Sequence, residues 1–249
     1  MLSDTTRGTA IVTGAAQGLG RTFAEALAAS GHAIAMLDVA ECDMTLDVIE
    51  RNGGLGISFV GDAADPADVS AFRDLVQDRL PPVRVLVNNA GISPYAPFSE
   101  TSIDDWHGIM RVNLDSAFLL TQAFLDDLIA SGAGRIVNLT STVVWDMQVK
   151  NMSAYVTSKA GIVGFTRALA SELGVNDITV NCIAPGIVLT PDIEERVSTE
   201  SLEAYRGRQA IKSLARPIDL VSALEFLVSE SSGQVTATVL PVNGGRVSW

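Results

Sequence analysis

Short apolar runs alternate with longer amphipathic segments along most of the chain. The apolar runs occupy residues 10–12, 33–37, 57–60, 83–87, 135–139 and 178–183. Continuous apolar runs of this length are typical of parallel strands that are buried on both faces. Between them, apolar residues recur at the spacing of a helix that packs one face on the core, as in Leu19, Phe23 and Leu27, in Val69, Phe72, Leu75 and Val76, and in Phe118, Leu119, Ala123 and Phe124.

The repeated order of strand and helix indicates an α/β protein. No linker, repeat or second composition class interrupts it, so we expect a single-domain doubly wound Rossmann fold over residues 1–249, with a parallel sheet of about seven strands and helices on both faces. Two irregular stretches, 142–152 and 191–212, follow predicted strands. Because such sheets bind ligands at the carboxyl ends of their strands, we expect these stretches to form a substrate pocket, with 191–212 as its cover.

Composition narrows the range of partners. The 249 residues are 47% hydrophobic, enough for a large core, and 17 basic against 29 acidic side chains give a net charge of −12. This charge repels phosphate backbones and anionic lipid surfaces, so we expect neither a nucleic-acid nor a membrane partner. The start of the chain lacks the pattern of a signal peptide, and the two cysteines, Cys42 and Cys182, provide no disulfide framework. We therefore expect a cytoplasmic protein.

A glycine-rich segment joins the first predicted strand to the first predicted helix. Its glycines, Gly14, Gly18 and Gly20, follow the pattern G-x-x-x-G-x-G, with Gln17 and Leu19 between them. The missing side chains let the backbone turn tightly and let a pyrophosphate approach the helix N-terminus, whose dipole favours anions. The segment therefore predicts a dinucleotide site, and the alternative is that the glycines serve only a tight turn.

Two carboxylates follow neighbouring strands at the same predicted edge. Asp38 ends the second strand and can accept hydrogen bonds from the ribose hydroxyls of an adenosine. No Arg or Lys stands beside it to neutralise a 2′-phosphate, which favours NAD (NADH) over NADP. Asp62, followed by Ala63, could meet the adenine amino group. For both aspartates the alternative is a residue that forms the turn after a strand.

Tyr155 and Lys159 lie four residues apart at the start of a helix-prone run, so one helical face would carry both. A free phenol titrates near ~10, and a tyrosine that exchanges protons near neutrality needs a cation close by, which Lys159 could supply. Ser141 lies upstream as a hydroxyl donor, with Thr142 as the alternative. These groups indicate nicotinamide-dependent alcohol or ketone chemistry, whereas each taken alone is compatible with a purely structural role.

The ordered motifs together resemble the short-chain dehydrogenase/reductase family, in the group with the TGxxxGxG and YxxxK signatures. The match covers almost the whole chain and rests on 13–20, 88–91, Asn113, Ser141, Tyr155, Lys159 and 185–190. The resemblance implies that Tyr155 is the general acid/base and that Lys159 lowers its pKa and binds the nicotinamide ribose. It further implies that Ser141 donates a hydrogen bond to the developing alkoxide, and that Asn113 holds a water that relays protons.

The same resemblance implies further cofactor contacts and an assembly. Asn89, Ala90 and Gly91 would wall the adenosine side, and Pro185, Gly186, Val188 and Thr190 would lie near the nicotinamide, with a helix N-cap as the alternative for Thr190. A homotetramer is also implied. Segments 138–142, 164–171 and 178–181 are most similar to NAD-dependent 1-phenylethanol dehydrogenases. In departure from the family pattern, Ser141 precedes Tyr155 by fourteen residues, where thirteen is usual, and Ala237 stands where a glycine is usual.

The substrate is indicated by bulky side chains on the predicted loops. Tyr95, Val143, Trp145, Met147 and Met152 would form a pocket suited to an aromatic or hydrophobic ketone, and a core role is the alternative for each. The basic residues Arg196, Arg206, Arg208 and Lys212 alternate with glutamates and are interpreted as a solvated helix face. His32 and His107 have no partners at metal-ligand spacing, so no metal site is expected.

Three functions are compatible with these residues. The first is an NAD-dependent dehydrogenase of hydrophobic secondary alcohols and ketones. The second is a reductase of the same family that acts on a ketoacyl thioester or a sugar. The third is a dinucleotide-binding sensor without catalysis, which the intact set of Asn113, Ser141, Tyr155 and Lys159 disfavours.

Overall fold

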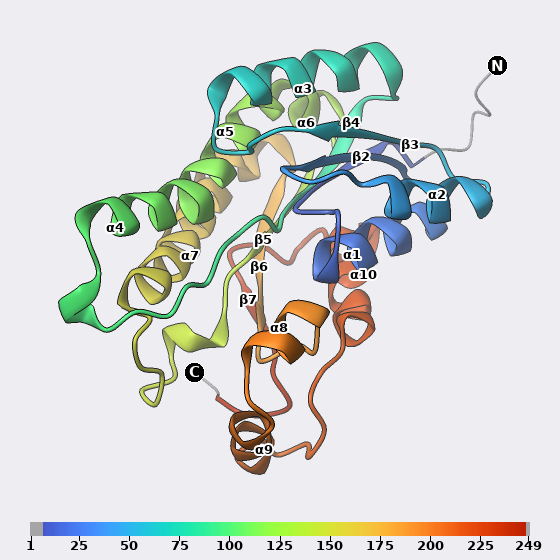
Figure 1. Ribbon diagram of the computed structural model, residues 1–249. Coiled ribbons are helices and arrows are strands. Elements are labelled where there is room, and N and C mark those ends of the chain that lie inside the picture. The colour runs from blue at the N-terminus through green and yellow to red at the C-terminus, as the bar shows by residue number, and fades with distance from the viewer. Residues whose placement is uncertain (1–6, 248–249) are drawn as a thin grey trace.

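The computed structural model describes residues 7–247 and contains one parallel sheet of seven strands. The strands lie in the order β3-β2-β1-β4-β5-β6-β7, so the chain winds outward in opposite directions from β1 and β4. This confirms the predicted single-domain, doubly wound α/β fold (Figure 1). The strands are β1 Thr9–Thr13, β2 Ala33–Asp38, β3 Gly56–Val60, β4 Val83–Asn88, β5 Arg135–Leu139, β6 Thr179–Pro185 and β7 Val239–Val242.

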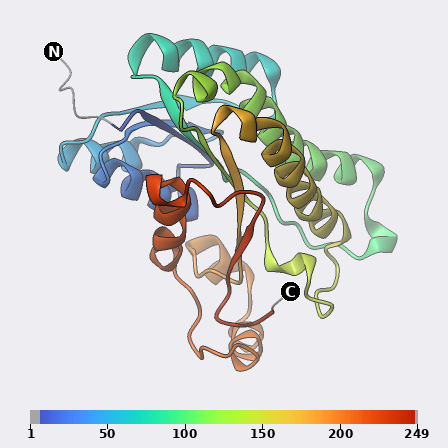
Figure 2. The ribbon, with the colours of Figure 1, turned by 180° about the vertical axis from the view of Figure 1, so that it is seen from behind.

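Helices cover both faces of the sheet (Figures 1 and 2). One core layer contains side chains of α1, α2 and α10, and the other contains side chains of α3, α5, α6 and α7. Two short helices, α8 and α9, lie beyond the carboxyl ends of the strands (Figure 1). The helices are α1 Gly18–Ala29, α2 Asp43–Arg51, α3 Pro66–Arg79, α4 Ile103–Met110, α5 Ser116–Ala123, α6 Leu125–Ala130, α7 Ser153–Leu173, α8 Pro191–Arg196, α9 Thr199–Gly207 and α10 Val221–Val228.

The central strands are apolar throughout because they bury both faces. In β1, Ala10 and Val12 enter one core layer, whereas Ile11 between them enters the other. The second layer holds Phe72 and Phe124 edge to face, with ring centroids 5.9 Å apart. Each such ring stabilises the fold by about 2–3 kcal/mol through burial.

Phe118 was predicted to face the core from α5, but it is 49% exposed. A π-helical turn, Arg111–Asp115, immediately precedes α5. Within α5 the buried face carries Ala117, Leu120 and Thr121, with Phe124 directly after the helix, so Phe118 lies on the opposite, outward face. A repeat of apolar positions within α5 does not reveal this turn.

The last strand forms although its approach departs from the family pattern. Ala237 adopts the left-handed conformation, with φ of 60°, at the position where the family usually has glycine. Its N–H donates to the carbonyl of Val180 at 2.9 Å, and β7 then pairs in parallel with β6. The side chain therefore costs about 1–2 kcal/mol in backbone strain without preventing the strand.

Both cysteines are buried and free, which agrees with the absence of a disulfide framework. Burial raises the pKa of Cys42 to about 12 and that of Cys182 to about 11, so neither thiol ionises near neutrality. No helix among residues 7–247 is long and apolar enough to cross a bilayer.

His32 makes the fold sensitive to acid. The residue is 6% exposed, its Nδ1 has no hydrogen-bond partner among the described residues, and burial lowers its pKa from 6.5 to about 4. Between these values the unfolded chain binds a proton that the folded chain excludes, so this histidine's contribution to stability is complete above pH 6.5 and lost as the pH falls to about 4.

We therefore expect His32→Gln to lessen the loss of unfolding free energy between pH 7 and pH 4.5 by about 2 kcal/mol, as urea denaturation would measure. The exposed His107 on α4 provides the matched control, His107→Gln, because solvent surrounds it in both states. An acid-induced loss that is equal in the wild type and in His32→Gln would contradict the assignment.

Candidate active site

The loop between β1 and α1 is shaped by its glycines. Gly14 has a φ of +66°, and a Cβ on Gly20 would lie 2.0 Å from the carbonyl oxygen of Gly14. Gln17 precedes α1 without a side-chain cap, and the first turn of the helix contains no acidic residue. Helix N–H groups and the positive end of the helix dipole therefore remain available at this edge of the sheet, as a pyrophosphate requires.

Asp38 braces this loop from the end of β2. Its carboxylate accepts hydrogen bonds from the N–H groups of Ala16, at 2.9 Å, and Ala40, at 3.0 Å. Each oxygen retains a lone pair with which to bind a hydroxyl. The segment 31–50 contains no Lys or Arg but several acidic residues, so the surroundings disfavour a further phosphate.

Asp62 and Ala63 follow β3, and both make contacts within the protein. The Asp62 carboxylate accepts from the N–H of Ala64 at 2.8 Å and pairs with the guanidinium of Arg111 at 2.7 Å. Ala63 is buried against the core. The turn-forming alternative for Asp62 is thus realised, and its contact with adenine stays a prediction.

The segment after β4 contacts both the glycine-rich loop and Lys159. Asn89 Nδ2 donates to the carbonyls of Thr13, at 2.8 Å, and Gly14, at 3.1 Å, and the N–H of Ala90 donates to Thr13 Oγ1 at 3.0 Å. At Gly91, a Cβ would lie 3.3 Å from Lys159 Nζ. The glycine therefore lets the backbone approach the lysine closely.

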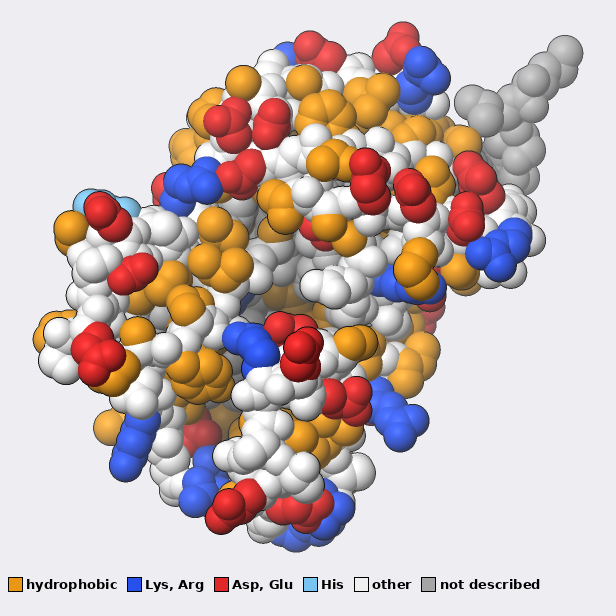
Figure 3. Space-filling model, viewed as in Figure 1, with side chains coloured by type: hydrophobic (Ala, Val, Ile, Leu, Met, Phe, Trp, Pro, Cys, Tyr) orange, Lys and Arg blue, Asp and Glu red, His pale blue; other side chains and the backbone are white. Residues whose placement is uncertain are grey.

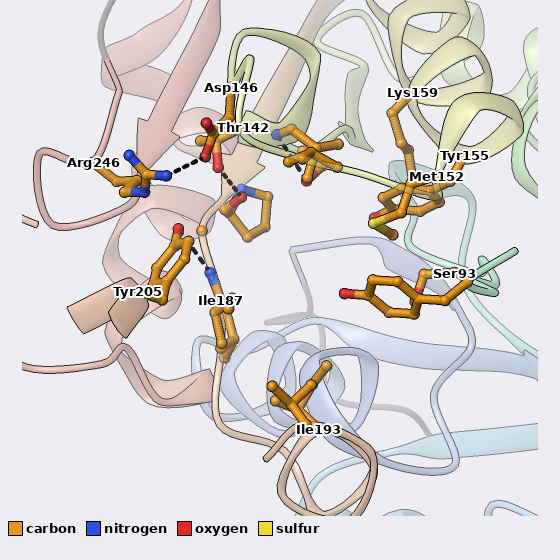
Figure 4. A pocket seen from close by; sticks show the side chains of 18 of the residues that line it. Ser93, Thr142, Asp146, Met152, Tyr155, Lys159, Ile187, Ile193, Tyr205 and Arg246 are labelled. Carbon is orange, nitrogen blue, oxygen red and sulfur yellow. Dashed lines mark hydrogen bonds and ion pairs between the residues drawn. The ribbon is translucent and has the colours of Figure 1, made fainter. Parts of the chain in front are cut away.

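Tyr155 and Lys159 lie on one face of α7, in its first two turns (Figure 4). Lys159 Nζ is 5.9 Å from the centre of the Tyr155 ring and donates to the carbonyl of Leu139 at 2.8 Å. The side chain of Ser141 is hydrogen-bonded to Tyr155, whereas Thr142 Oγ1 donates to the carbonyl of Pro185 at 3.0 Å. Ser141, not Thr142, therefore lies beside the phenol.

The electrostatics of this group differ from the expectation. Burial raises the pKa of Tyr155, and the opposing influences are the hydrogen bond of Ser141 and the positive charge of Arg196. The sequence assigned this lowering of the pKa to Lys159, but the ammonium of Lys159 is directed to the carbonyl of Leu139. Burial lowers the pKa of Lys159 itself to about 8, so its charge changes within a mildly alkaline range.

Asn113 lies in the π-helical turn and contacts the loop after β4. Its Oδ1 accepts from the N–H of Ile92 at 2.7 Å, and its Nδ2 donates to the Ile92 carbonyl at 2.9 Å and to Ser158 Oγ at 3.0 Å. Both amide hydrogens are therefore used within the protein. The side chain fastens this loop to α7, and a water relay through Asn113 stays a prediction.

A cavity of about 810 Å³ opens beside these groups at the carboxyl edge of the sheet, and the hollow is visible in Figure 3. It brings Ser141, Tyr155 and Lys159 together with one part of the predicted cofactor residues, namely Leu19, Asn89, Gly91, Pro185, Gly186, Val188 and Thr190. The others lie outside its lining, at or just after the ends of β1 to β4. Thr190 Oγ1 also accepts from the N–H of Ile193 at 3.4 Å. Thr190 is thus the N-cap of α8, as the alternative for this residue predicts.

Only some of the residues predicted to form a substrate pocket line this cavity. Tyr95, Val143 and Met152 line the cavity, but Trp145 and Met147 do not. Met147 is 96% exposed. The reason is the short 3-10 helix Thr142–Val144, which turns the chain so that residues 143 and 146 face the cavity and residues 145 and 147 face away from it.

Several polar residues of the cavity were missed or misjudged. Arg196 and Arg208 line it, so their interpretation as a solvated face is wrong for these two. The helical spacing of Ser198, Ser201, Tyr205 and Arg208 along α9 contains the signal for a shared face. Nothing in the local sequence around Arg246 indicates that it lines the same cavity, because the chain reaches it only after β7.

Comparison with known proteins decides the family. A family model described as short chain dehydrogenase matches residues 8–201. The chain is a short-chain dehydrogenase. The short-chain dehydrogenases most similar to it include a subunit of the (2S)-[(R)-hydroxy(phenyl)methyl]succinyl-CoA dehydrogenase of Thauera aromatica, which is 36% identical over 95% of each chain.

Two further relatives show the range of the family. The 3-oxoacyl-[acyl-carrier-protein] reductase of Pseudomonas aeruginosa is 32% identical, over 95% of this chain and 96% of its own. Among solved structures, a candidate NAD(P)-dependent gluconate 5-dehydrogenase of Beutenbergia cavernae with NADP bound at low occupancy has a TM-score of 0.90. It is 35% identical and covers 97% of each chain. The short-chain dehydrogenase fold of this protein therefore spans the full length of these relatives.

Proposed function

We propose that this short-chain dehydrogenase is an NAD(H)-dependent oxidoreductase that interconverts a secondary alcohol and a ketone. The observation that carries the proposal is the convergence of Ser141, Tyr155 and Lys159 on one cavity that also contacts the glycine-rich loop. The proposed cover of this cavity is 191–212, whose helices α8 and α9 contribute side chains to its lining.

The residues present fit a dinucleotide. The uncapped N-terminus of α1 and the glycines that admit close approach suit a pyrophosphate, and Asp38 suits a ribose. The bound nicotinamide would supply the hydride to a ketone or accept it from an alcohol. With Leu19 and Gly91 on the same wall as Lys159, the nicotinamide end would lie beside the catalytic group.

In this proposal, Tyr155 moves the proton and its neighbours hold it in place. During reduction its hydroxyl donates a proton to the carbonyl oxygen, and during oxidation the phenolate accepts the proton of the alcohol. Ser141 is hydrogen-bonded to the same hydroxyl and can donate to the oxygen on which negative charge develops. Lys159, which donates to the carbonyl of Leu139, places a positive charge on the same face of α7 as Tyr155.

The preference for NAD rests on Asp38 and on its uniformly acidic surroundings. A 2′-phosphate at this position would face a carboxylate without a compensating cation. We expect kcat/KM to be at least about tenfold higher with NADH than with NADPH, a difference of ~1.4 kcal/mol or more, in initial-rate assays of ketone reduction. A preference for NADPH, the cofactor type seen in the Beutenbergia structure, would contradict this part of the proposal.

The substrate class divides the proposal into two candidates. The lining by Tyr95, Val143 and Met152 supports aryl or hydrophobic ketones. The polar side chains of the cavity, including Arg208 and Tyr205, support the second candidate, a reductase of ketoacyl thioesters or sugars. Acetophenone, acetoacetyl-CoA and a ketose, assayed side by side, would separate the two. Turnover of none of these ketones would favour the non-catalytic sensor.

We also propose a homotetramer, as is common in the family. The outer face of α7 carries the small exposed residues Gly164 and Ala168, which would allow close packing of a second helix. A Cβ built on Gly164 meets nothing within 4 Å.

A further inference from the structure

The lining of the cavity is rich in cations. Lys150, Arg196, Arg208 and Arg246 line it, and Asp146 is the only acidic side chain of the described residues that does so. This excess cannot follow from overall composition, because the chain has a net charge of −12. Figure 3 shows basic side chains beside the hollow on a surface where acidic groups are frequent.

Two of these cations, Arg246 and Arg196, form ion pairs with carboxylates. The Arg246 guanidinium pairs with Asp146 at 2.8 Å and stacks 5.4 Å from the centre of the Tyr205 ring (Figure 4). Its buried Nε has no hydrogen-bond partner among residues 7–247. Arg196 pairs with Asp192 at 2.6 Å and donates to Ser93 Oγ at 3.3 Å. Asp146 neutralises one of the cations, and Asp192 a second.

The other two cations have no such partner. The side chains of Lys150 and Arg208 form no hydrogen bond or ion pair with any residue in the described range 7–247. They come from different segments, because Lys150 precedes α7 and Arg208 directly follows α9. Ser198, Ser201 and Tyr205 line the same cavity, but the Ser198 hydroxyl donates to that of Ser201 and the Tyr205 hydroxyl accepts from the N–H of Ile187. Lys150 and Arg208 are therefore the cationic donors of the lining whose side chains have no partner among residues 7–247. A neutral aryl ketone would offer these donors few acceptors.

We propose that the substrate is a hydroxy or keto compound that carries an anionic oxygen group, a carboxylate or a phosphoryl group, and that Arg208 and Lys150 bind this group where they line the cavity. The inference rests on the proposed oxidoreductase function and specifies its substrate. A guanidinium binds a carboxylate or phosphate through two parallel hydrogen bonds, and the surrounding cations raise the local concentration of an anion. The buried pair of Asp146 and Arg246 keeps the wall behind this site rigid.

The test compares ketones that differ in charge but not in the reacting carbonyl. With NADH, kcat/KM is measured for 4-acetylbenzoate and its methyl ester, and for acetoacetyl-CoA and the neutral N-acetylcysteamine thioester. We expect the anionic member of at least one pair to be favoured about tenfold or more, as a charge-assisted hydrogen bond would give. Preference within the first pair identifies a carboxylate, and preference within the second identifies a phosphoryl group.

The variant Arg208→Gln should raise KM for the favoured anion about tenfold and leave the neutral partner within about twofold. Arg206→Gln is the matched control, because Arg206 lies on the same helix, pairs with Glu203 and does not line the cavity. A purely structural role of Arg208 would instead alter both members of a pair equally.

Calorimetric binding of the same four compounds separates this inference from the proposed function. Tighter binding of an anion in the wild type, lost in Arg208→Gln, supports the anionic site even when no ketone is reduced, in which case only the proposed function fails. Equal binding and equal turnover of charged and neutral partners, unchanged in Arg208→Gln, would overturn the anionic site while the oxidoreductase stands.

Discussion

Replacing Tyr155 with Phe should lower kcat for ketone reduction by about a thousandfold or more while NADH still binds. In the proposed mechanism the Tyr155 hydroxyl, which lines the cavity beside Ser141, is the group that transfers the proton. General acid–base catalysis contributes about 10²–10⁴-fold, and its loss cannot be replaced by Ser141, which only donates a hydrogen bond in the proposed mechanism. Single-turnover rates at saturating NADH would measure the effect.

The control for this variant is Tyr95→Phe. Tyr95 lines the same cavity but is 61% exposed and is not hydrogen-bonded to the catalytic groups. Its change should alter kcat less than about tenfold, since it removes no proton donor. NADH binding, followed by fluorescence, should be unchanged in Tyr155→Phe because the hydroxyl alone is removed. A Tyr155→Phe enzyme that retains more than a tenth of the wild-type rate would refute the assignment of the acid.

Gly20→Ala should have the second large effect, on both stability and cofactor binding. The new Cβ would lie 2.0 Å from the carbonyl oxygen of Gly14 and 2.6 Å from Asn89 Nδ2, so the loop itself must move. Overpacking of this kind typically costs about 1–3 kcal/mol, and here backbone atoms rather than a flexible side chain obstruct the methyl group. We expect the unfolding free energy to fall by about 3 kcal/mol and the Kd for NADH to rise at least about tenfold.

Gly108→Ala is the matched substitution, because Gly108 also lies within a helix, α4, and its Cβ would meet nothing within 4 Å. It should stabilise the protein by about 0.5–1 kcal/mol through the higher helix propensity of Ala. Urea denaturation and a binding titration measure both variants. Unchanged stability and unchanged NADH affinity in Gly20→Ala would show that the loop does not have the tight packing described above.

The sequence was sufficient to predict the sheet and the shared helical face of Tyr155 and Lys159, because both depend on local patterns. Runs such as 83–87 identify buried strands without reference to their neighbours, and helical spacing places Tyr155 and Lys159 on one face. The cavity was harder to predict because its lining depends on turns and on distant segments. Met147 faces solvent because of a single 3-10 turn, and Arg246 reaches Asp146 only through the folded chain.

The electrostatic role of Lys159 was also beyond local reasoning. Spacing places an ammonium near a phenol, but only the structure shows the carbonyl of Leu139 that takes up its hydrogen bond. The same limit applies to Asn113, whose contacts with Ile92 and Ser158 depend on the π-helical turn. A periodic pattern fixes which face a side chain occupies, whereas the competing partners on that face come from other elements.

The Asp38 carboxylate accepts two hydrogen bonds, from the amides of Ala16 and Ala40, and these constrain any attempt to redesign the proposed coenzyme preference. A substitution that makes room for an extra phosphate, such as Asp38→Ser, also withdraws the acceptor that orders the turn after β1. Successful engineering would thus have to introduce a basic group and, in the same variant, a replacement acceptor for the Ala16 amide. A single substitution at Asp38 should therefore weaken the binding of both NADH and NADPH before it changes the ratio of their affinities.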